Sequence, residues 1–296
     1  AYLVIQGEMS VGSLAAIVLL TGRIIQPVLR VEAFLAGSDN LRQHREEFED
    51  LLSTPPRQDG TQHLVGVDTL ALTGVGTALE PVLGIGFSGL DLTLHRGDCI
   101  AITGGDRQAR RVFLRLLIGE LPVTAGKVLL NGRPADDFAL SDRQRLIKLL
   151  SADNGLIEGT LIENLTVFQP RQYRDRAIDL TRRIGIEETI SQSPAGFALE
   201  VGPDSKAGLP KSLADAVTLV GSLVSDPDVI LFDEANGALD RETDARLLEI
   251  LRAGMPDRIT VLVSNRPSFL KLATRTFDIS NLTEAAEAAE AVDVRE

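Results

Sequence analysis

Short, wholly apolar runs alternate with stretches of helical pattern along much of this chain. The clearest apolar runs are VILFD at residues 229–233 and ITVLVSN at residues 259–265, and the amphipathic run RETDARLLEILRAG at residues 241–254 lies between them. A strand that is apolar at successive positions is buried on both faces, which is typical of a parallel sheet covered by helices on each side. The pattern therefore predicts an α/β fold.

The same alternation extends back to about residue 70. We predict strands at residues 70–75, 90–95, 99–103 and 126–132, and helices at residues 110–121, 137–150, 171–190 and 213–224.

A break in this pattern separates the predicted domain from the residues before it. The run STPPRQDGTQ at residues 53–62 contains two prolines and a glycine, which cannot continue a helix. We therefore divide the 296 residues into a first segment at 1–52, a linker at 53–62, a domain at 63–282 and an acidic, alanine-rich tail at 283–296.

The first segment allows two interpretations. Its apolar run at residues 11–20 is followed by the polar residues Arg23, Gln26, Pro27 and Arg30. A membrane span needs about 20 mostly apolar residues, so these polar groups would have to face a protein interior. An amphipathic core helix is the other interpretation, and composition alone does not separate the two.

Composition restricts the partners. The net charge is −12 and no basic stripe stands out, which argues against a nucleic-acid partner. The single cysteine, Cys99, cannot form an internal disulfide.

The strand at residues 229–233 ends in two adjacent carboxylates, Asp233 and Glu234. Ligands of α/β sheets bind at the carboxyl ends of the strands. An aspartate there can hold the water shell of Mg²⁺, and the next carboxylate can polarise an attacking water. Asp233 is thus a candidate metal residue and Glu234 a candidate catalytic base, the alternative being a vestigial carboxylate that is only hydrogen-bonded or solvated.

The longer run VILFDEANGALD resembles the Walker B strand and D-loop of the ATP-binding cassette (ABC) transporters, in particular exporters with fused membrane and nucleotide-binding domains. Other runs resemble the family in the right order: FSGLDLTLHRGDCIAITG before Walker A, AGKVLLNG and GTLIENL after it, and GFALEVGPDSKAGLPKSLADAV before the signature. The run GRIIQPVLRVEAFLAG resembles the last membrane helix of type I secretion exporters.

The resemblance implies a P-loop NTPase-like nucleotide-binding domain with a mixed sheet core and a helical subdomain. It implies that the C-terminal fragment of an all-α transmembrane domain precedes this domain. It also implies ATP and Mg²⁺ as cofactors, a membrane location, and a second nucleotide-binding domain as partner.

The family's Walker A pattern, G-x-x-G-x-G-K-S/T, falls on residues that depart from it. The positions are Gly104, Gly105, Asp106, Arg107, Gln108, Ala109, Arg110 and Arg111. Arg107 and Ala109 replace glycines that would let the backbone wrap phosphates. Arg110 replaces a compact lysine ammonium with a planar guanidinium, and Arg111 replaces the hydroxyl that would coordinate Mg²⁺.

The other motif positions also differ. The Q-loop glutamine position falls on Ala152, the LSGGQ signature reads LPKSL at residues 209–213 with Ser212 in place of a glycine, and the switch histidine position is Asn265. Asparagine can donate or accept a hydrogen bond but cannot titrate near neutral pH.

Three hypotheses follow. The leading one is a degenerate, ATPase-defective exporter subunit at the inner membrane, with its nucleotide-binding domain on the cytoplasmic face and paired with an active subunit or with its own copy. The second is an interaction or regulatory scaffold that binds no nucleotide. The third is an active ATPase with variant motifs, in which Glu234 is the base.

Overall fold

The computed structural model describes residues 59–79, 83–151, 155–202 and 208–282, together with residues 10, 12, 13, 15, 16, 19, 20, 23 and 25. The chain divides into two units, residues 1–58 and residues 59–296. In the first unit, the described residues after Ser10 are helical, and the amide of Ser13 donates to Ser10 Oγ at 3.1 Å.

The predicted end of a membrane domain at residues 1–52 lies mostly outside the described residues, as do most of the predicted linker and all of the tail at residues 283–296. Among the described residues, we find no helix with the length and apolar character needed to cross a membrane.

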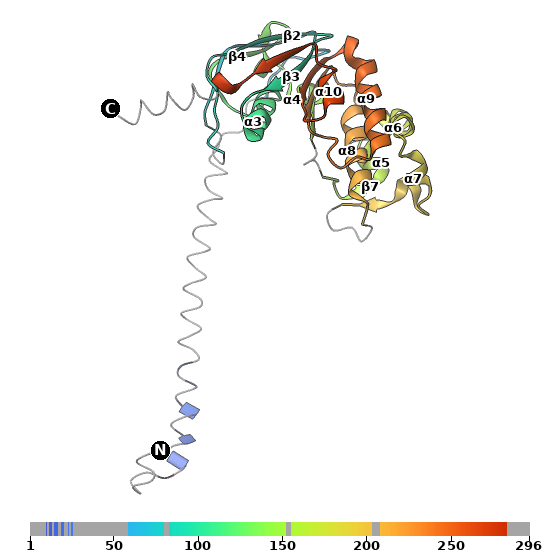
Figure 1. The fold of residues 1–296 in the computed structure, drawn as a ribbon. Helices are drawn as coiled ribbons and strands as arrows, with labels where there is room; N and C mark the ends of the chain where they lie inside the picture. Colours follow the sequence, from blue (N-terminus) through green and yellow to red (C-terminus); the bar gives the residue numbers. More distant parts are fainter. Residues whose placement is uncertain are drawn as a thin grey trace, which may run out of the picture. The chain divides into compact units, whose positions relative to one another are not determined.

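A five-stranded parallel sheet forms the centre of the second unit (Figure 1). Its strand order is β11-β3-β10-β9-β6, and every neighbouring pair runs parallel. The strands are β3 (Cys99–Thr103), β6 (Ile147–Ser151), β9 (Val229–Asp233), β10 (Ile259–Val263) and β11 (Arg275–Asp278). The parallel sheet predicted from the apolar runs is confirmed.

Strand β9 shows why these runs are apolar at successive positions. Val229 and Leu231 belong to one hydrophobic cluster, whereas Ile230 and Phe232 belong to a second cluster on the other side. Because side chains alternate between the faces of a strand, both faces of the sheet are covered.

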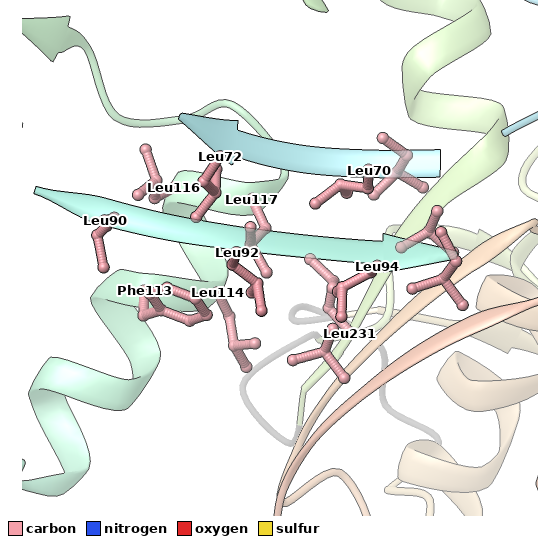
Figure 2. Close-up of a cluster of buried hydrophobic side chains, with 14 of the residues drawn as sticks. Leu70, Leu72, Leu90, Leu92, Leu94, Phe113, Leu114, Leu116, Leu117 and Leu231 are labelled. Atoms are coloured by element: carbon pink, nitrogen blue, oxygen red, sulfur yellow. The ribbon is translucent and has the colours of Figure 1, made fainter. Parts of the chain in front are cut away.

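The first cluster lies between the parallel sheet, helix α3 (Arg107–Leu117) and a four-stranded antiparallel sheet. Leucines of β1 (Thr69–Thr77) and β2 (Leu90–His95) point toward Phe113 and Leu117 of α3 in Figure 2. The antiparallel sheet has the order β2-β1-β4-β5 and comprises β1 (Thr69–Thr77), β2 (Leu90–His95), β4 (Val123–Leu130) and β5 (Arg133–Pro134). The described strands thus form a mixed sheet core, as the resemblance implied.

The second cluster is covered by a group of helices that Figure 1 shows gathered together. They are α5 (Leu161–Leu165), α6 (Pro170–Ile184), α7 (Glu187–Ser191), α8 (Lys211–Leu223) and α9 (Arg241–Gly254). Helix α5 begins with a capping box, in which Thr160 and Glu163 satisfy each other's backbone amides. Strand β7 (Gly159–Thr160) directly precedes α5 and pairs with β8 (Glu200–Val201), which follows α7 in the chain.

Three predicted helices differ from the structure in their bounds by more than two residues. The helix predicted at residues 110–121 begins three residues earlier and ends four residues earlier, as α3 (Arg107–Leu117). The predicted helix at residues 137–150 is wrong in its last four residues, because α4 (Leu140–Leu146) ends before them and Ile147–Ser151 pairs with β9 as strand β6. The burial available at the sheet edge overrides the local helical pattern. The predicted helix at residues 171–190 is two helices, since Gly185 ends α6 with a left-handed φ of 90°.

Candidate functional site

Asp233 and Glu234 lie at the carboxyl end of β9, which runs between β10 and the edge strand β6. Asp233 is 2% exposed, and Glu234 turns the chain with a left-handed φ of 46°. The amide of Glu234 donates to the carbonyl of Val263 at 3.0 Å, which fixes this turn against the end of β10. Strand β9 therefore ends at Asp233. Both carboxylates lie at the carboxyl end of the sheet, where α/β proteins bind their ligands.

The loop between β3 and α3 lies at the same edge. Gly104 and Gly105 have left-handed φ values of 74° and 56°. A Cβ on Gly104 would lie 1.9 Å from Asp278 Oδ1, so no larger residue fits there without a shift of that side chain. The strand, glycine turn and helix predicted around residues 104–111 are therefore present.

Backbone amides of this loop are bound by side chains and carbonyls of the chain itself. Asp106 caps α3, and its Oδ1 accepts from the amide of Ala109 at 2.7 Å. The amide of Gly105 donates to Ser280 Oγ at 3.2 Å, and the amide of Arg110 donates to the Asp106 carbonyl at 3.3 Å. A carboxylate already interacts with the positive end of the helix, where an anion would bind.

Arg110 folds back onto the loop. Its Nη1 donates to the carbonyls of Gly104 and Gly105, at 3.1 and 3.0 Å. A guanidinium presents several donors in a planar arrangement, which suits two neighbouring carbonyls. The side chain at the lysine position of the family therefore binds the loop backbone.

Arg111 pairs with the buried aspartate of β9. Its Nε donates to Asp233 Oδ2 at 3.0 Å, and the Arg111 side chain is 26% exposed. Burial raises the pKa of Asp233 above its usual range, and the hydrogen bond and charge of Arg111 act in the opposite direction. The other oxygen, Oδ1, is buried and has no hydrogen-bond partner within the described part of the chain.

Arg107 and Asn265 both contact the second carboxylate. Arg107 Nη2 lies 3.1 Å from Glu234 Oε2, and Asn265 Nδ2 donates to Glu234 Oε1. Asn265 lies two residues after the end of β10, and the pairing of β10 with β9 brings it beside Glu234. The structure thus joins three of the positions predicted from sequence into one contact.

The remaining predicted positions contribute less to this arrangement. Ala109 is buried under the first turn of α3, and Gln108 is exposed on that turn. Ser212 lies in the first turn of α8 and lines a separate cavity of about 530 Å³ with residues of α6, α7 and α9. Ala152 falls outside the described residues.

Sequence reasoning did not find Ser280 or Asp278, which contact the glycine turn. No motif points to them, because they reach the loop only through the pairing of β11 with β3. It also did not find Arg266, which donates to the carbonyl of Asn236 at 2.9 Å and pairs with Asp244 at 2.7 Å.

A magnesium ion does not fit the carboxylates as they are arranged. Mg²⁺ takes oxygen ligands at about 2.0–2.1 Å in octahedral geometry. Each carboxylate has a guanidinium nitrogen at hydrogen-bond distance, from Arg111 at 3.0 Å and from Arg107 at 3.1 Å. A divalent cation at Asp233 Oδ2 and Glu234 Oε2 would have to displace both guanidiniums, and one at the unpaired Asp233 Oδ1 would be repelled by the charge of Arg111 on the same carboxylate.

The strand, glycine turn and helix beside an acidic β9 define a domain of the P-loop α/β class. The sequence profile of the family described as "ABC transporter" matches residues 87–237, just over half of the 296 residues. The chain therefore belongs to the ABC transporter family.

Curated relatives carry related names. The chain is 26% identical over 286 residues to the alpha-hemolysin translocation ATP-binding protein HlyB of Escherichia coli O157:H7, which covers 95% of this chain and 40% of that protein. It is 27% identical over 280 residues to the leukotoxin translocation ATP-binding protein LktB of Mannheimia glucosida, covering 93% and 39%. The chain thus spans about two fifths of the length of these relatives.

A solved structure supports the fold. The bacterial Atm1-family ABC exporter with ATP bound superposes with a TM-score of 0.69 at 21% identity, covering 81% of this chain and 42% of that one. The predicted fold, that of an ABC nucleotide-binding domain, is confirmed.

Proposed function

We propose that this chain is the nucleotide-binding-domain portion of an exporter subunit that does not hydrolyse ATP itself. In this proposal it works at the inner membrane, with this domain on the cytoplasmic face, and depends on a partner subunit with competent motifs for energy. The pairing of Asp233 with Arg111 and of Glu234 with Arg107 is the observation that carries the proposal.

The ion pairs oppose catalysis at two steps. Asp233 Oδ1 has no hydrogen-bond partner among the described residues, but the guanidinium bound to Oδ2 already supplies a positive charge, which opposes a metal ion at the same carboxylate. A general base must accept a proton from a positioned water, and both oxygens of Glu234 are contacted, by Arg107 and Asn265.

The loop supports the same conclusion for binding. Phosphate loops hold the ligand with free backbone amides, whereas here the amides of Gly105 and Ala109 donate to the side chains of Ser280 and Asp106. The carboxylate of Asp106 would repel a polyphosphate at the same helix end. We therefore expect triphosphate binding to be weak or absent.

The export role and the partner rest on similarity. The names of HlyB and LktB describe translocation ATP-binding proteins, and the match extends along nearly the whole of this chain. Nucleotide-binding domains of this family act in pairs, so a chain with a closed loop calls for a second domain with competent motifs. We propose a heterodimer with an active subunit, because two copies of this chain would have no competent site.

Nucleotide binding and turnover by the purified chain test the proposal. We expect no saturable binding of a fluorescent ATP analogue below millimolar concentration, with or without Mg²⁺, and phosphate release at the background rate. The positive control is the fourfold variant Arg107→Gly, Ala109→Gly, Arg110→Lys and Arg111→Ser, which restores the family's loop. Circular dichroism establishes that it folds, and we expect it to gain Mg²⁺-dependent binding.

Turnover by the unmodified chain would overturn the proposal if Glu234→Gln abolished it. That result would mean that the arginines leave the carboxylates when nucleotide binds.

A further inference from the structure

We propose that Arg111 and Arg107 are built-in substitutes for a divalent cation, which hold the loop and β9 together without any ligand. This inference rests on the proposed function, because it explains what the closed site does in place of binding nucleotide. It concerns stability and cation dependence, so it can fail while the proposed function stands.

The charges of the four side chains balance. Two guanidiniums from the first turns of α3 meet two adjacent carboxylates at the end of β9. Adjacent carboxylates repel each other, and a buried one is destabilising unless it is paired. A divalent cation is one way to supply two positive charges at this point, and two arginines are another.

The two pairs differ in burial. In the first pair, the side chain of Asp233 is 2% exposed and that of Arg111 is 26% exposed. In the second pair, the side chain of Arg107 is 59% exposed. Removal of one partner from a buried pair is strongly destabilising, since the other charge stays uncompensated. The pair of Arg111 with Asp233 therefore makes the larger contribution.

The contacts join segments that are far apart in sequence. Arg111 and Asp233 are separated by 122 positions, and Arg110 braces the carbonyls of the same loop. The loop, the start of α3 and the end of β9 are thus connected without metal or nucleotide. We infer that this junction has the same geometry whether or not Mg²⁺ is present.

Thermal unfolding of the chain in EDTA and in Mg²⁺ tests this inference. The unmodified chain should melt at the same temperature in both. Arg111→Ser should melt roughly 5–10 °C lower in EDTA, because Asp233 loses its partner. Mg²⁺ alone should return part of that loss, since removal of the guanidinium leaves Asp233 Oδ2 unpaired as Oδ1 already is, and Na⁺ at equal ionic strength should not.

Two further variants keep the test interpretable. Arg115→Ser lies one turn along α3, and because Arg115 pairs with the half-exposed Glu120, this variant should change little and show no response to Mg²⁺. Arg111→Lys keeps the charge and should lose less than Arg111→Ser. Stabilisation of the unmodified chain by Mg²⁺, or an Arg111→Ser variant that melts like the unmodified chain, would overturn the inference.

Discussion

The loop at residues 104–111 and the turn at residues 236–244 flank the same end of β9 but are held in different ways. The loop depends on partners distant in sequence, such as Arg111 with Asp233 and Gly105 with Ser280, separated by 122 and 175 positions. In the turn, Asn236 donates to Asp244 only eight positions away, and Asp240 caps α9 by accepting from the amides that follow it.

The difference separates two kinds of sequence motif. Local hydrogen bonds need only a short run of residues, so a run such as ANGALD specifies its own turn. Long-range ion pairs need a completed fold, and they can replace a bound ligand without any change in the framework. The family resemblance is accordingly strong in the turn and weak in the loop.

The largest expected effect is on the packing beneath the loop. Phe113 is fully buried in α3 and lies edge-on to Phe87 at 5.9 Å. We expect Phe113→Ala to lower the free energy of unfolding by about 3–5 kcal/mol in urea titrations, since it removes a large core side chain. Phe168→Ala is the matched control, because Phe168 is 43% exposed.

If Phe113→Ala lowered the free energy of unfolding by less than about 1 kcal/mol, it would contradict the expectation that core packing beneath the loop has the largest effect. It would mean that the ion pairs, rather than the core, hold α3 and its loop in place.

A smaller loss should follow from a change in the turn. Asp244→Ala removes the acceptor of Asn236, which is 2% exposed, and the partner of Arg266. We expect a loss of about 1–3 kcal/mol, because a buried amide is left without an acceptor. Glu249→Ala on the exposed side of the same helix should have no measurable effect in the same titration. Equal losses from both variants would show that the turn needs no such contact.

The smallest expected effect is at the cap of α9. Asp240→Ala should lower the free energy of unfolding by about 1 kcal/mol, as for other N-cap residues. The amide of Thr243, then its hydroxyl, holds the pKa of Asp240 below its usual range. Its charge-dependent contribution is therefore complete above about pH 4, where an unfolded aspartate is ionised, and is lost as the pH falls through the lower, folded pKa.

The variant Asp240→Asn checks that sign, because it keeps the cap but does not titrate. Its stability should fall less than that of the unmodified chain between neutral pH and pH 3, measured by urea titration at each pH. An equal fall in both chains would mean that the carboxylate charge does not contribute.

Much of the fold could be predicted because buried strands and helices have characteristic patterns of apolar residues along the sequence. Continuous apolar runs predicted β3, β9 and β10, and the amphipathic pattern predicted α9. Strand β6 was missed, because IKLLS can be buried in either conformation and only its place beside β9 decides between them.

The candidate site could be predicted only as a set of positions. Glu234, Asp233 and the loop residues were chosen by order and spacing, and their roles remain proposals. Nothing in a one-dimensional pattern indicated that Arg107 would meet Glu234, or that Asp106 would accept from the amide of Ala109 rather than face a ligand.

By itself, the sequence determined which segments are buried and which side chains stand in the loop, because these depend on residues a few positions apart. Only the tertiary structure decided that the loop arginines bind the β9 carboxylates. The strand order β3-β10-β9 sets which helix start lies beside which strand end, and electrostatic pairing depends on that distance in space rather than on separation along the chain.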